Sequence, residues 1–172
     1  GENYRTNLQF ESEIEKNEST YWIVFELLWR DFFRFTHLQK GNSMFYKNGF
    51  NNANLPILKM NKTKLNKWIK GETKEDFVNA AMIELQQNGW ISNRARQIVA
   101  SYLINNLKVD YRLGAAYFEQ TLIDYDVCSN WGNWAYLAGV GNDPRGNRKF
   151  DTEKQAKEYD GNEAFRNYWL NK

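Results

Sequence analysis

The longest run of regularly spaced hydrophobic residues lies between positions 19 and 40. Apolar side chains recur there at intervals of three and four residues, which is the repeat of one face of an α-helix. Most of them are aromatic, and they cover a wide stripe rather than a narrow seam. The pattern therefore predicts a largely buried helix over 19–40, whose stripe consists of Tyr21, Trp22, Phe25, Leu28, Trp29, Phe32, Phe33 and Phe35.

Glycine, proline and asparagine interrupt this pattern between positions 41 and 58. These residues favour turns, so we expect an irregular connection that is long for a compact domain. Helical periodicity then returns, and hydroxyl side chains precede three of the expected helices, where they can cap the first turn. We expect one helix from Thr63 to Gly71, one from Thr73 to Gly89, and one that Ser92 begins.

Three further helices are expected near 113–123, 152–159 and 162–170. Between the first and second of these, the segment DYDVCSNWGNW at 124–134 is polar, aromatic and contains glycine. Functional sites, rather than cores, tend to lie in such a segment between two apolar ones. No second domain boundary is visible, and residues 1–18 form a poorly defined segment. We therefore predict one all-α domain over 1–172, built as an irregular helical bundle.

The composition narrows the classes of function. Lysine and arginine total 23 and aspartate and glutamate 21, so a net charge of +2 gives no strong field that attracts nucleic acid. The single cysteine, Cys128, excludes an internal disulfide and a cysteine metal cluster, and it favours a reducing, cytoplasmic setting. The single histidine, His37, excludes a histidine-rich zinc site, and no metal is expected. No apolar run approaches the roughly 18 residues of a membrane span.

Three long blocks stand out, whereas nucleotide-binding loops of the GxxxxGK[ST] type, HExxH and paired CxxC motifs are absent from the sequence. The blocks are ELLWRDFFRF at 26–35, ISNRARQIVASYL at 91–103 and DYDVCSNWGNWAYLAGVGNDPRGNRKFD at 124–151. In this order and spacing they closely resemble the photolyase/cryptochrome family, DASH branch, over about residues 19–160. The resemblance implies an all-helical FAD-binding domain. In the family, reduced FAD absorbs light and passes an electron to a cyclobutane pyrimidine dimer, which splits and returns it.

The resemblance assigns four residues to the flavin. Arg96 and Asp124 match an arginine–aspartate ion pair over the flavin ring, and a planar guanidinium suits both partners. Asp126 matches the carboxylate that hydrogen-bonds the polar edge of the isoalloxazine, and Asn130 matches the amide that faces its redox-active nitrogen. In isolation, Asp124 and Asp126 are better explained by a solvated Asx turn after a helix. The surrounding motif reverses that preference.

A second set of residues matches the cavity in which the family holds a flipped DNA lesion. Trp29 and Tyr136 would offer aromatic surfaces to the dimer, and Glu26 and Asn93 would hydrogen-bond its polar edges. Core packing is the competing explanation for these residues, above all for Trp29. Gln97 stands where conventional photolyases carry methionine, which indicates the DASH branch and lesions in single-stranded DNA.

Phosphate contacts complete the expected DNA interface. Contacts of this kind add affinity that depends on salt but not on base sequence. Taken individually, arginines of this kind are more often ordinary surface residues than phosphate contacts. A run of five lysines between positions 59 and 70 is interpreted first as a solvated helix face and second as a DNA stripe. The candidate arginines are Arg30, Arg94, Arg145 and Arg148.

The chain departs from the family along its electron relay, which usually consists of three tryptophans. Trp134 matches the first, but Tyr111 occupies the second position and Leu58 the third. A phenol is harder to oxidise than an indole and must lose its proton, so we expect a slow or broken relay along this route. Other tryptophans offer a detour whose distances the sequence does not give, namely Trp22, Trp68, Trp90 and Trp131.

A second departure concerns the segments that come first in the family. Family members begin with an α/β antenna domain and a Ser/Thr-rich segment that holds the FAD phosphates, and neither precedes residue 19. We therefore expect a fragment or reduced relative that binds FAD weakly, with FAD, single-stranded or damaged DNA and the missing N-terminal part of the fold as partners. The main hypothesis is pyrimidine-dimer repair in single-stranded DNA, or light sensing. The alternative is a non-enzymatic helical module that has lost FAD and binds nucleic acid or a protein.

Overall fold

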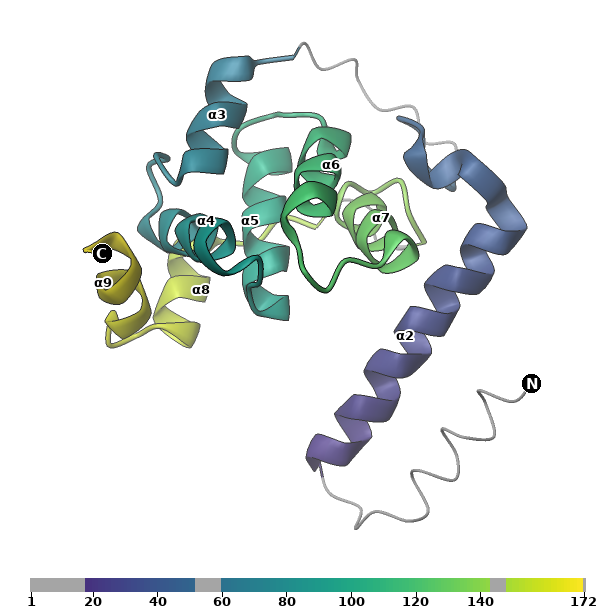
Figure 1. Ribbon diagram of the computed structural model, residues 1–172, viewed down its shortest axis with the longest axis horizontal. Helices are drawn as coiled ribbons and strands as arrows, with labels where there is room; N and C mark the ends of the chain where they lie inside the picture. The colour runs from purple at the N-terminus through teal and green to yellow at the C-terminus, as the bar shows by residue number, and fades with distance from the viewer. Residues whose placement is uncertain (1–17, 52–59, 143–147, 172) are drawn as a thin grey trace.

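A computed structural model describes residues 18–51, 60–142 and 148–171 of the protein. Within these ranges every regular element is a helix (Figure 1), so the predicted all-α fold is confirmed for them. The elements are α2 (Glu18–Lys40), the short 3-10 helix η1 (Gly41–Phe45), α3 (Lys62–Lys70), α4 (Asp76–Asn88), α5 (Asn93–Asn105), α6 (Tyr111–Thr121), α7 (Val127–Leu137), α8 (Thr152–Tyr159) and α9 (Ala164–Leu170).

Helix α5 lies at the centre of the bundle and packs against α4, α6, α7 and α8. Its side chains Ile98, Val99 and Leu103 are completely buried. Helix α3 adds Trp68, which is also completely buried and donates its indole N–H to the carbonyl oxygen of Val99 at 3.0 Å. Because this buried polar group has a partner, Trp68 can anchor α3 on the bundle without an unpaired donor.

Side-chain caps decide where two of the helices begin. Ser92 caps α5 as predicted, because its hydroxyl accepts a hydrogen bond from the N–H of Ala95 at 3.2 Å. The prediction that Thr63 begins α3 is wrong. Asn61 begins that helix instead, since its side-chain oxygen accepts from the N–H of Lys64 at 3.0 Å. Asparagine is at least as good a cap as threonine, and it comes first along the chain.

Helix α4 begins later than predicted, whereas both glycine stops are confirmed. The hydroxyl of Thr73 accepts from the N–H of Glu75 at 3.2 Å within a turn, so the helix itself starts at Asp76. Gly71 and Gly89 end α3 and α4 in the left-handed conformation, with φ of 68° and 66°. The helices expected near 113–123, 152–159 and 162–170 differ from their predicted ranges by at most two residues at either end. None of the described helices combines the length and apolar character that crossing a membrane requires.

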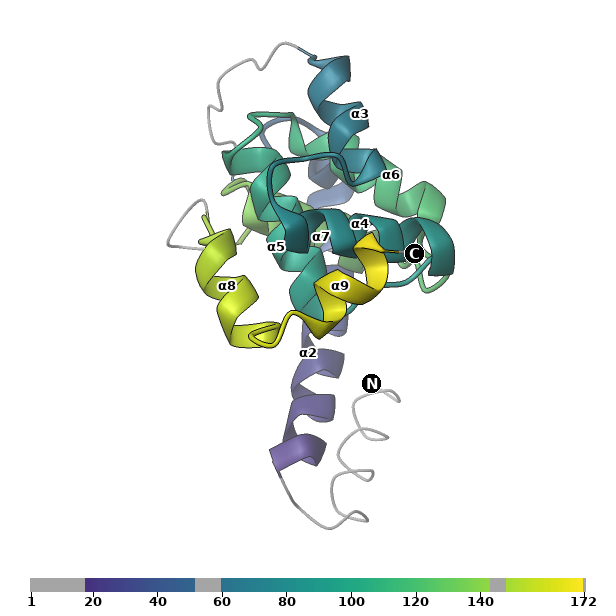
Figure 2. The ribbon, with the colours of Figure 1, turned by 90° about the vertical axis from the view of Figure 1, so that its left-hand side faces the viewer.

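Helix α2 coincides with the predicted helix, but the prediction that it is largely buried is wrong. It packs mainly against α7 and η1, and its first turns extend away from the other helices in both views (Figures 1 and 2). Of the predicted stripe only Phe33 is buried, whereas Phe35 is 61% exposed. Leu38, one turn further on, is 78% exposed. Too few of the described elements lie beside α2 to cover a stripe of this width.

Most of the segment 124–134 is helix, although no helix was predicted there. Asp126 caps α7, which begins at Val127 and continues through Gly132. A Cβ atom at Gly132 would overlap the ring of Phe33 from α2. This glycine therefore serves close packing of two helices, a use that sequence alone does not distinguish from a turn.

Candidate functional site

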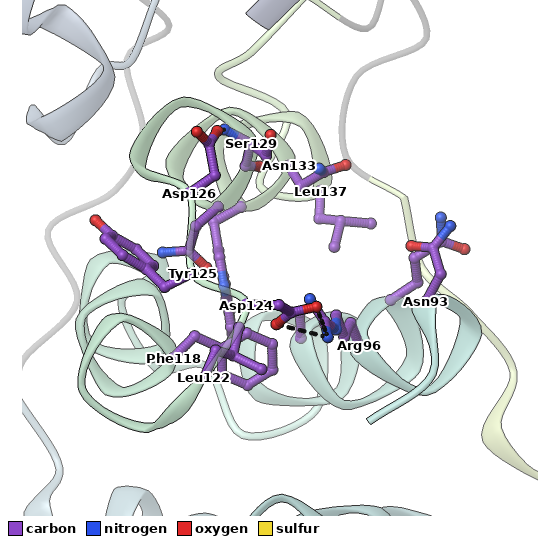
Figure 3. A pocket seen from close by; sticks show the side chains of 14 residues that line it. Asn93, Arg96, Phe118, Leu122, Asp124, Tyr125, Asp126, Ser129, Asn133 and Leu137 are labelled. Atoms are coloured by element: carbon purple, nitrogen blue, oxygen red, sulfur yellow. Dashed lines mark hydrogen bonds and ion pairs between the residues drawn. The ribbon is translucent and has the colours of Figure 1, made fainter. Parts of the chain in front are cut away.

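A first pocket lies where α5, α6, α7 and the connection between α6 and α7 meet (Figure 3). It contains about 550 Å³ of empty space, part of which is open to solvent. The fold brings together here all four residues that were assigned to the flavin and the first residue of the expected electron relay. These residues are Arg96, Asp124, Asp126, Asn130 and Trp134.

Arg96 and Asp124 form an ion pair at the rim of the first pocket, with the two charged groups facing each other in Figure 3. Nη2 of Arg96 donates to both carboxylate oxygens of Asp124, at 3.1 and 2.9 Å. Nε of Arg96 donates to the carbonyl oxygen of Ile91 at 2.9 Å. Since the side chains are 26% and 45% exposed, the pair contributes little to folding stability. Its main effect is to fix the orientation of the guanidinium.

Asp126 combines two roles, because it begins α7 and also lines the first pocket. Its Oδ1 accepts from the N–H of Ser129 at 2.8 Å, and its Oδ2 accepts from Nη2 of Arg34 at 3.5 Å. Partial burial raises the pKa of Asp126, but the hydrogen bonds from Ser129 and the charge of Arg34 outweigh it. The net result is a pKa below the ordinary value, so the side chain is an ionised, acceptor-only group at neutral pH.

Asn130 is the buried polar residue of the first pocket. Its side-chain nitrogen donates to the carbonyl oxygen of Ala115 on α6 at 3.0 Å. This bond ties α7 to α6 and fixes the plane of the amide group. Asn130 therefore contributes a preoriented amide to the pocket wall, and part of its donor capacity is used within the protein.

The apolar lining of the first pocket includes Phe118, Leu122, Trp134 and Leu137, all of which are buried. The ring of Trp134 stands edge-on to that of Phe118, with 5.1 Å between centroids and an angle of 84°. Gly114 on α6 makes room for the indole, because a Cβ atom at this position would overlap it. Close helix packing thus places Trp134 at the pocket wall.

A second pocket lies between α2, α5 and α7 and has about 1370 Å³ of empty space, part of it open solvent. It collects every residue that was assigned to the lesion cavity. Two of the candidate phosphate-binding arginines, Arg94 and Arg148, line it as well. The lesion-cavity residues that line it are Glu26, Trp29, Asn93, Gln97 and Tyr136.

Aromatic and cationic side chains contact one another along the second pocket. The rings of Trp29 and Tyr136 meet edge to face with centroids 6.2 Å apart. The guanidinium carbon of Arg148 lies 4.9 Å from the centroid of Tyr136, within the range of a cation–π contact. Arg94 donates from Nη1 to Oε1 of Gln97 at 3.1 Å. Trp29 is half-buried and lines this pocket, and its ring also packs against Phe33.

The other candidate cations within the described residues line neither pocket. Arg30 lines neither pocket, and its guanidinium forms an ion pair with Asp31 at 3.0 Å. Arg145 lies outside the described residues. The described members of the lysine run are exposed on α3 and line neither pocket, in agreement with a solvated helix face. They are Lys62, Lys64, Lys67 and Lys70.

The two pockets share part of their wall. Four residues line both of them, two from the first turns of α5 and two from α7. The sequence interpretation missed two of the four, Asn133 and Leu137, because it expected no helix between 123 and 152. Asn133 follows Ser129 by four residues and Leu137 follows Trp134 by three, so both would lie on the pocket face of a helix through this segment. The shared residues are Asn93, Gln97, Asn133 and Leu137.

Residues 22–172 match the model of one protein family, the FAD binding domain of DNA photolyase. The chain belongs to this family. Among curated relatives of this photolyase domain, cryptochrome DASH from Danio rerio is 48% identical over 170 residues, which are 97% of this chain and 32% of the relative. The resemblance to the photolyase/cryptochrome family and to its DASH branch is thereby confirmed.

Solved structures agree with this assignment of the photolyase domain. A cryptochrome from Synechocystis superposes with a TM-score of 0.89 at 47% identity, over 98% of this chain and 35% of that one. An archaeal photolyase from Sulfolobus tokodaii, described with two FAD molecules, gives a TM-score of 0.82 at 30% identity, over 95% and 37%. The chain therefore spans about a third of the length of the relatives it matches.

The residues of the first pocket fit the flavin of a photolyase in chemical character. An isoalloxazine is a flat ring system with an apolar end and a polar end that carries N–H and C=O groups. The pocket offers aromatic and aliphatic side chains together with two carboxylates and an oriented amide. Such an apolar lining with a few placed polar groups is the usual form of a cofactor site.

Tyr111, at the second position of the expected relay, is a buried structural residue of this photolyase domain. It is 3% exposed, and its hydroxyl donates to the carbonyl oxygen of Tyr46 at 2.7 Å. The carbonyl oxygen of Met44 lies 3.3 Å from the same hydroxyl. Burial raises the pKa of Tyr111 to about 12. Its environment therefore strongly opposes loss of the phenolic proton. Leu58, at the third position, lies outside the described residues.

Proposed function

We propose that this chain holds the isoalloxazine of FAD in the first pocket and a pyrimidine dimer of single-stranded DNA in the second. The proposal applies to the chain as the photolyase domain of a light-dependent repair or light-sensing protein. The observation that carries it is the shared wall of the two pockets. A planar cofactor and a flipped pyrimidine dimer would meet across Asn93, Gln97, Asn133 and Leu137.

The polar residues of the first pocket act as orienting groups. The ionised carboxylate of Asp126 accepts hydrogen bonds only, which suits an N–H of the flavin's polar end. Asp124 and the carbonyl oxygen of Ile91 aim the guanidinium of Arg96 along the rim. When bound and reduced, FAD would supply the light-excited electron for dimer splitting. The protein supplies position and an apolar wall against the ring.

The second pocket supplies stacking surfaces and positive charge. Trp29 and Tyr136 offer edge-to-face aromatic rings, and Arg148 places a cation against Tyr136. Stacking on aromatic rings tolerates any base, and arginines near the rim add affinity for phosphates. A single strand is favoured because the dimer reaches the pocket without the cost of opening a duplex.

Flavin uptake is the test of the first pocket. The purified chain is incubated with excess FAD, the unbound cofactor is removed, and the visible absorption spectrum is recorded. Asp126→Asn removes the charge but keeps a good helix cap, so we expect loss of the retained flavin band with unchanged thermal unfolding. Asp151→Asn, which makes the same change at the cap of α8, is the matched control and should keep the band. Equal uptake by Asp126→Asn contradicts the assignment.

Lesion discrimination is the test of the second pocket. Binding of two single-stranded oligonucleotides that differ only by one cyclobutane dimer is compared. We expect tighter binding of the damaged strand, and loss of this preference in Trp29→Ala. Equal binding of both strands would leave only electrostatic contact with the backbone. A folded chain that binds DNA but takes up no FAD would instead support the non-enzymatic module.

The exposed apolar face of α2 supports a further partner, the part of the relatives' fold that this chain does not match. Phe35, Leu38 and Phe32 are 61%, 78% and 41% exposed, and the chain matches only 32% of its Danio rerio relative. Co-expression with the unmatched part of that relative tests this. We expect a flavin-containing complex, and Leu38→Lys should dissociate it without lowering the stability of the chain alone. A complex that survives this change contradicts the proposal.

A further inference from the structure

Three oxidisable rings form a continuous series from the first pocket toward the surface. Trp134 of α7 and Trp68 of α3 meet edge to face, with 6.2 Å between ring centroids and an angle of 77°. Trp68 and Tyr117 of α6 follow at 5.7 Å and 71°. Since electron tunnelling weakens steeply with distance, rings in contact are the favoured steps of a relay.

The exposure of the three rings gives the series a direction. Trp134 is 2% exposed and lines the first pocket, whereas Trp68 is completely buried. The indole N–H of Trp68 donates to the carbonyl oxygen of Val99, which is too weak a base to take the proton. Tyr117 is only partly buried and is thus closer to solvent than either indole, although burial raises the pKa of its phenol as well. The far end of the series is thus where oxidation can be followed by proton release.

Tyr111 is a poorer end for such a series. Its hydroxyl meets the backbone carbonyl oxygens of Tyr46 and Met44, which are too weakly basic to take its proton, and its side chain is almost completely buried. A phenol that keeps its proton is hard to oxidise, and one that releases it to water is easier to oxidise than an indole that stays protonated. A radical at Tyr117 can therefore be stabilised by proton release, whereas a radical at Tyr111 is not stabilised to the same extent.

We propose that Trp134, Trp68 and Tyr117 form a one-electron relay between the first pocket and the surface. The inference rests on the proposed function for its acceptor, an oxidised flavin in that pocket. Trp134 gives one electron to the photoexcited acceptor and regains one from Trp68, which regains one from Tyr117. Tyr117 then releases its phenolic proton to water and becomes a neutral radical. A thiol in solution returns one electron and one proton to Tyr117 and leaves as a thiyl radical.

A covalent photo-oxidant can test the relay without any flavin. A ruthenium polypyridyl label is attached at Asp124→Cys, which lies in the first pocket and not in the second. Cys128→Ala removes the native thiol, and Tyr125→Phe removes a phenol of the same pocket that the label could oxidise directly. A cobalt(III) amine complex takes one electron from the excited label. The oxidised label then takes one electron from Trp134, and transient absorption follows indole and phenol radicals.

The variants give opposed outcomes for the two tyrosines. We expect a phenoxyl band in the labelled parent, its loss in Tyr117→Phe with a longer-lived indole radical, and no change in Tyr111→Phe. Trp68→Phe should also lose the band. If that core variant fails to fold, Tyr117→Phe still decides, because it removes only a hydroxyl at a partly exposed position. A phenoxyl band that persists in Tyr117→Phe, or disappears in Tyr111→Phe, overturns the proposal.

A second measurement separates this proposal from the proposed function. In flavin-loaded chain with a thiol reductant, Tyr117→Phe should slow photoreduction while flavin content stays equal to that of the parent. A chain that takes up no flavin contradicts the proposed function, and the labelled protein still decides the relay. Equal flavin content with equal photoreduction in the parent and Tyr117→Phe contradicts the relay and leaves flavin binding intact.

Discussion

The carboxylate of Asp126 accepts a hydrogen bond from the backbone N–H of Ser129 at 2.8 Å, in the first turn of α7. The same carboxylate lines the first pocket and faces the guanidinium of Arg34. One side chain therefore begins the helix that carries Asn130 and Trp134 and also sets the charge of the pocket. Substitutions at Asp126 must separate these two effects.

Asp126→Ala should lower the free energy of unfolding by about 1 kcal/mol, because the helix loses its cap. Asp126→Asn should leave it within a few tenths of a kcal/mol, since asparagine caps equally well. Urea denaturation measures both. Asp151→Ala removes the corresponding cap of α8, whose carboxylate accepts from the N–H of Lys154, and should cost a similar amount. Equal stability of Asp126→Ala and the parent would show that the cap contributes nothing.

Asp160 should make the protein sensitive to acid. Burial raises its pKa, but the hydrogen bonds from the side chain of Arg166 and from the backbone N–H groups of Phe165 and Arg166 outweigh it, so the folded-state pKa lies below the ordinary value. Its stabilisation is complete above the unfolded-state pKa of about 4 and is lost as pH falls through the folded-state pKa. Urea midpoints across this range should fall less steeply in Asp160→Asn than in the parent.

Gly114→Ala should destabilise the protein by about 1–3 kcal/mol, because the added methyl group overlaps the buried rings and methyls around it. In an exposed helix the same change would stabilise by up to about 1 kcal/mol. At Gly114 the new Cβ would collide with Trp134 and with Leu103 of α5, both buried. Thermal unfolding shows whether the substitution lowers or raises stability, and tryptophan fluorescence reports displacement of Trp134. A higher melting temperature would contradict this close packing of α6 on α7.

Tyr111→Phe should lower stability by about 1 kcal/mol near neutral pH, because the carbonyl oxygens of Tyr46 and Met44 lose their donor. Burial raises the pKa of Tyr111 to about 12. A raised folded-state pKa means that the stabilisation is complete below the unfolded-state value of about 10 and is lost as pH rises toward 12. The difference between parent and variant should therefore shrink above about pH 10 in urea denaturation at a series of pH values. A constant difference would mean that Tyr111 ionises normally.

Arg148→Ala should weaken binding of single-stranded DNA and reduce its salt dependence. For each phosphate that the variant no longer neutralises, the slope of log K against log salt should become less negative by about 0.7. Fluorescence anisotropy at several salt concentrations measures the slope. Lys70→Ala on α3 removes an exposed cation that lines neither pocket, and it should change neither affinity nor slope. If Lys70→Ala has the larger effect, the lysine run is the DNA stripe.

Most helices could be predicted because local signals mark their ends. The hydroxyl of Ser92 and the left-handed Gly71 and Gly89 act within a few residues of chain, so the sequence contains the whole signal. The site residues of α5 and α7 were assigned through the resemblance. Nothing in their periodicity would have shown that Arg96 and Asp124, which are 28 positions apart, form an ion pair.

The errors in α2 and α7 share one physical cause, which is that neighbours outside the local segment decide burial. Gly132 resembles a turn residue, yet it sits inside α7 because Phe33 packs on it. The stripe of α2 resembles a core face, yet its burial depends on elements that are far away in sequence. For the same reason the contact of Trp134 with Trp68 needed coordinates, since the two rings belong to different helices.

The wall shared by the two pockets has a thermodynamic consequence. Asn93 and Gln97 on α5, with Asn133 and Leu137 on α7, touch both spaces. An occupant of one space that shifts these side chains changes the free energy of binding in the other. By thermodynamic linkage this coupling is reciprocal. If a ligand in the first pocket changes the affinity of the second pocket by some factor, a ligand in the second pocket changes the affinity of the first by the same factor.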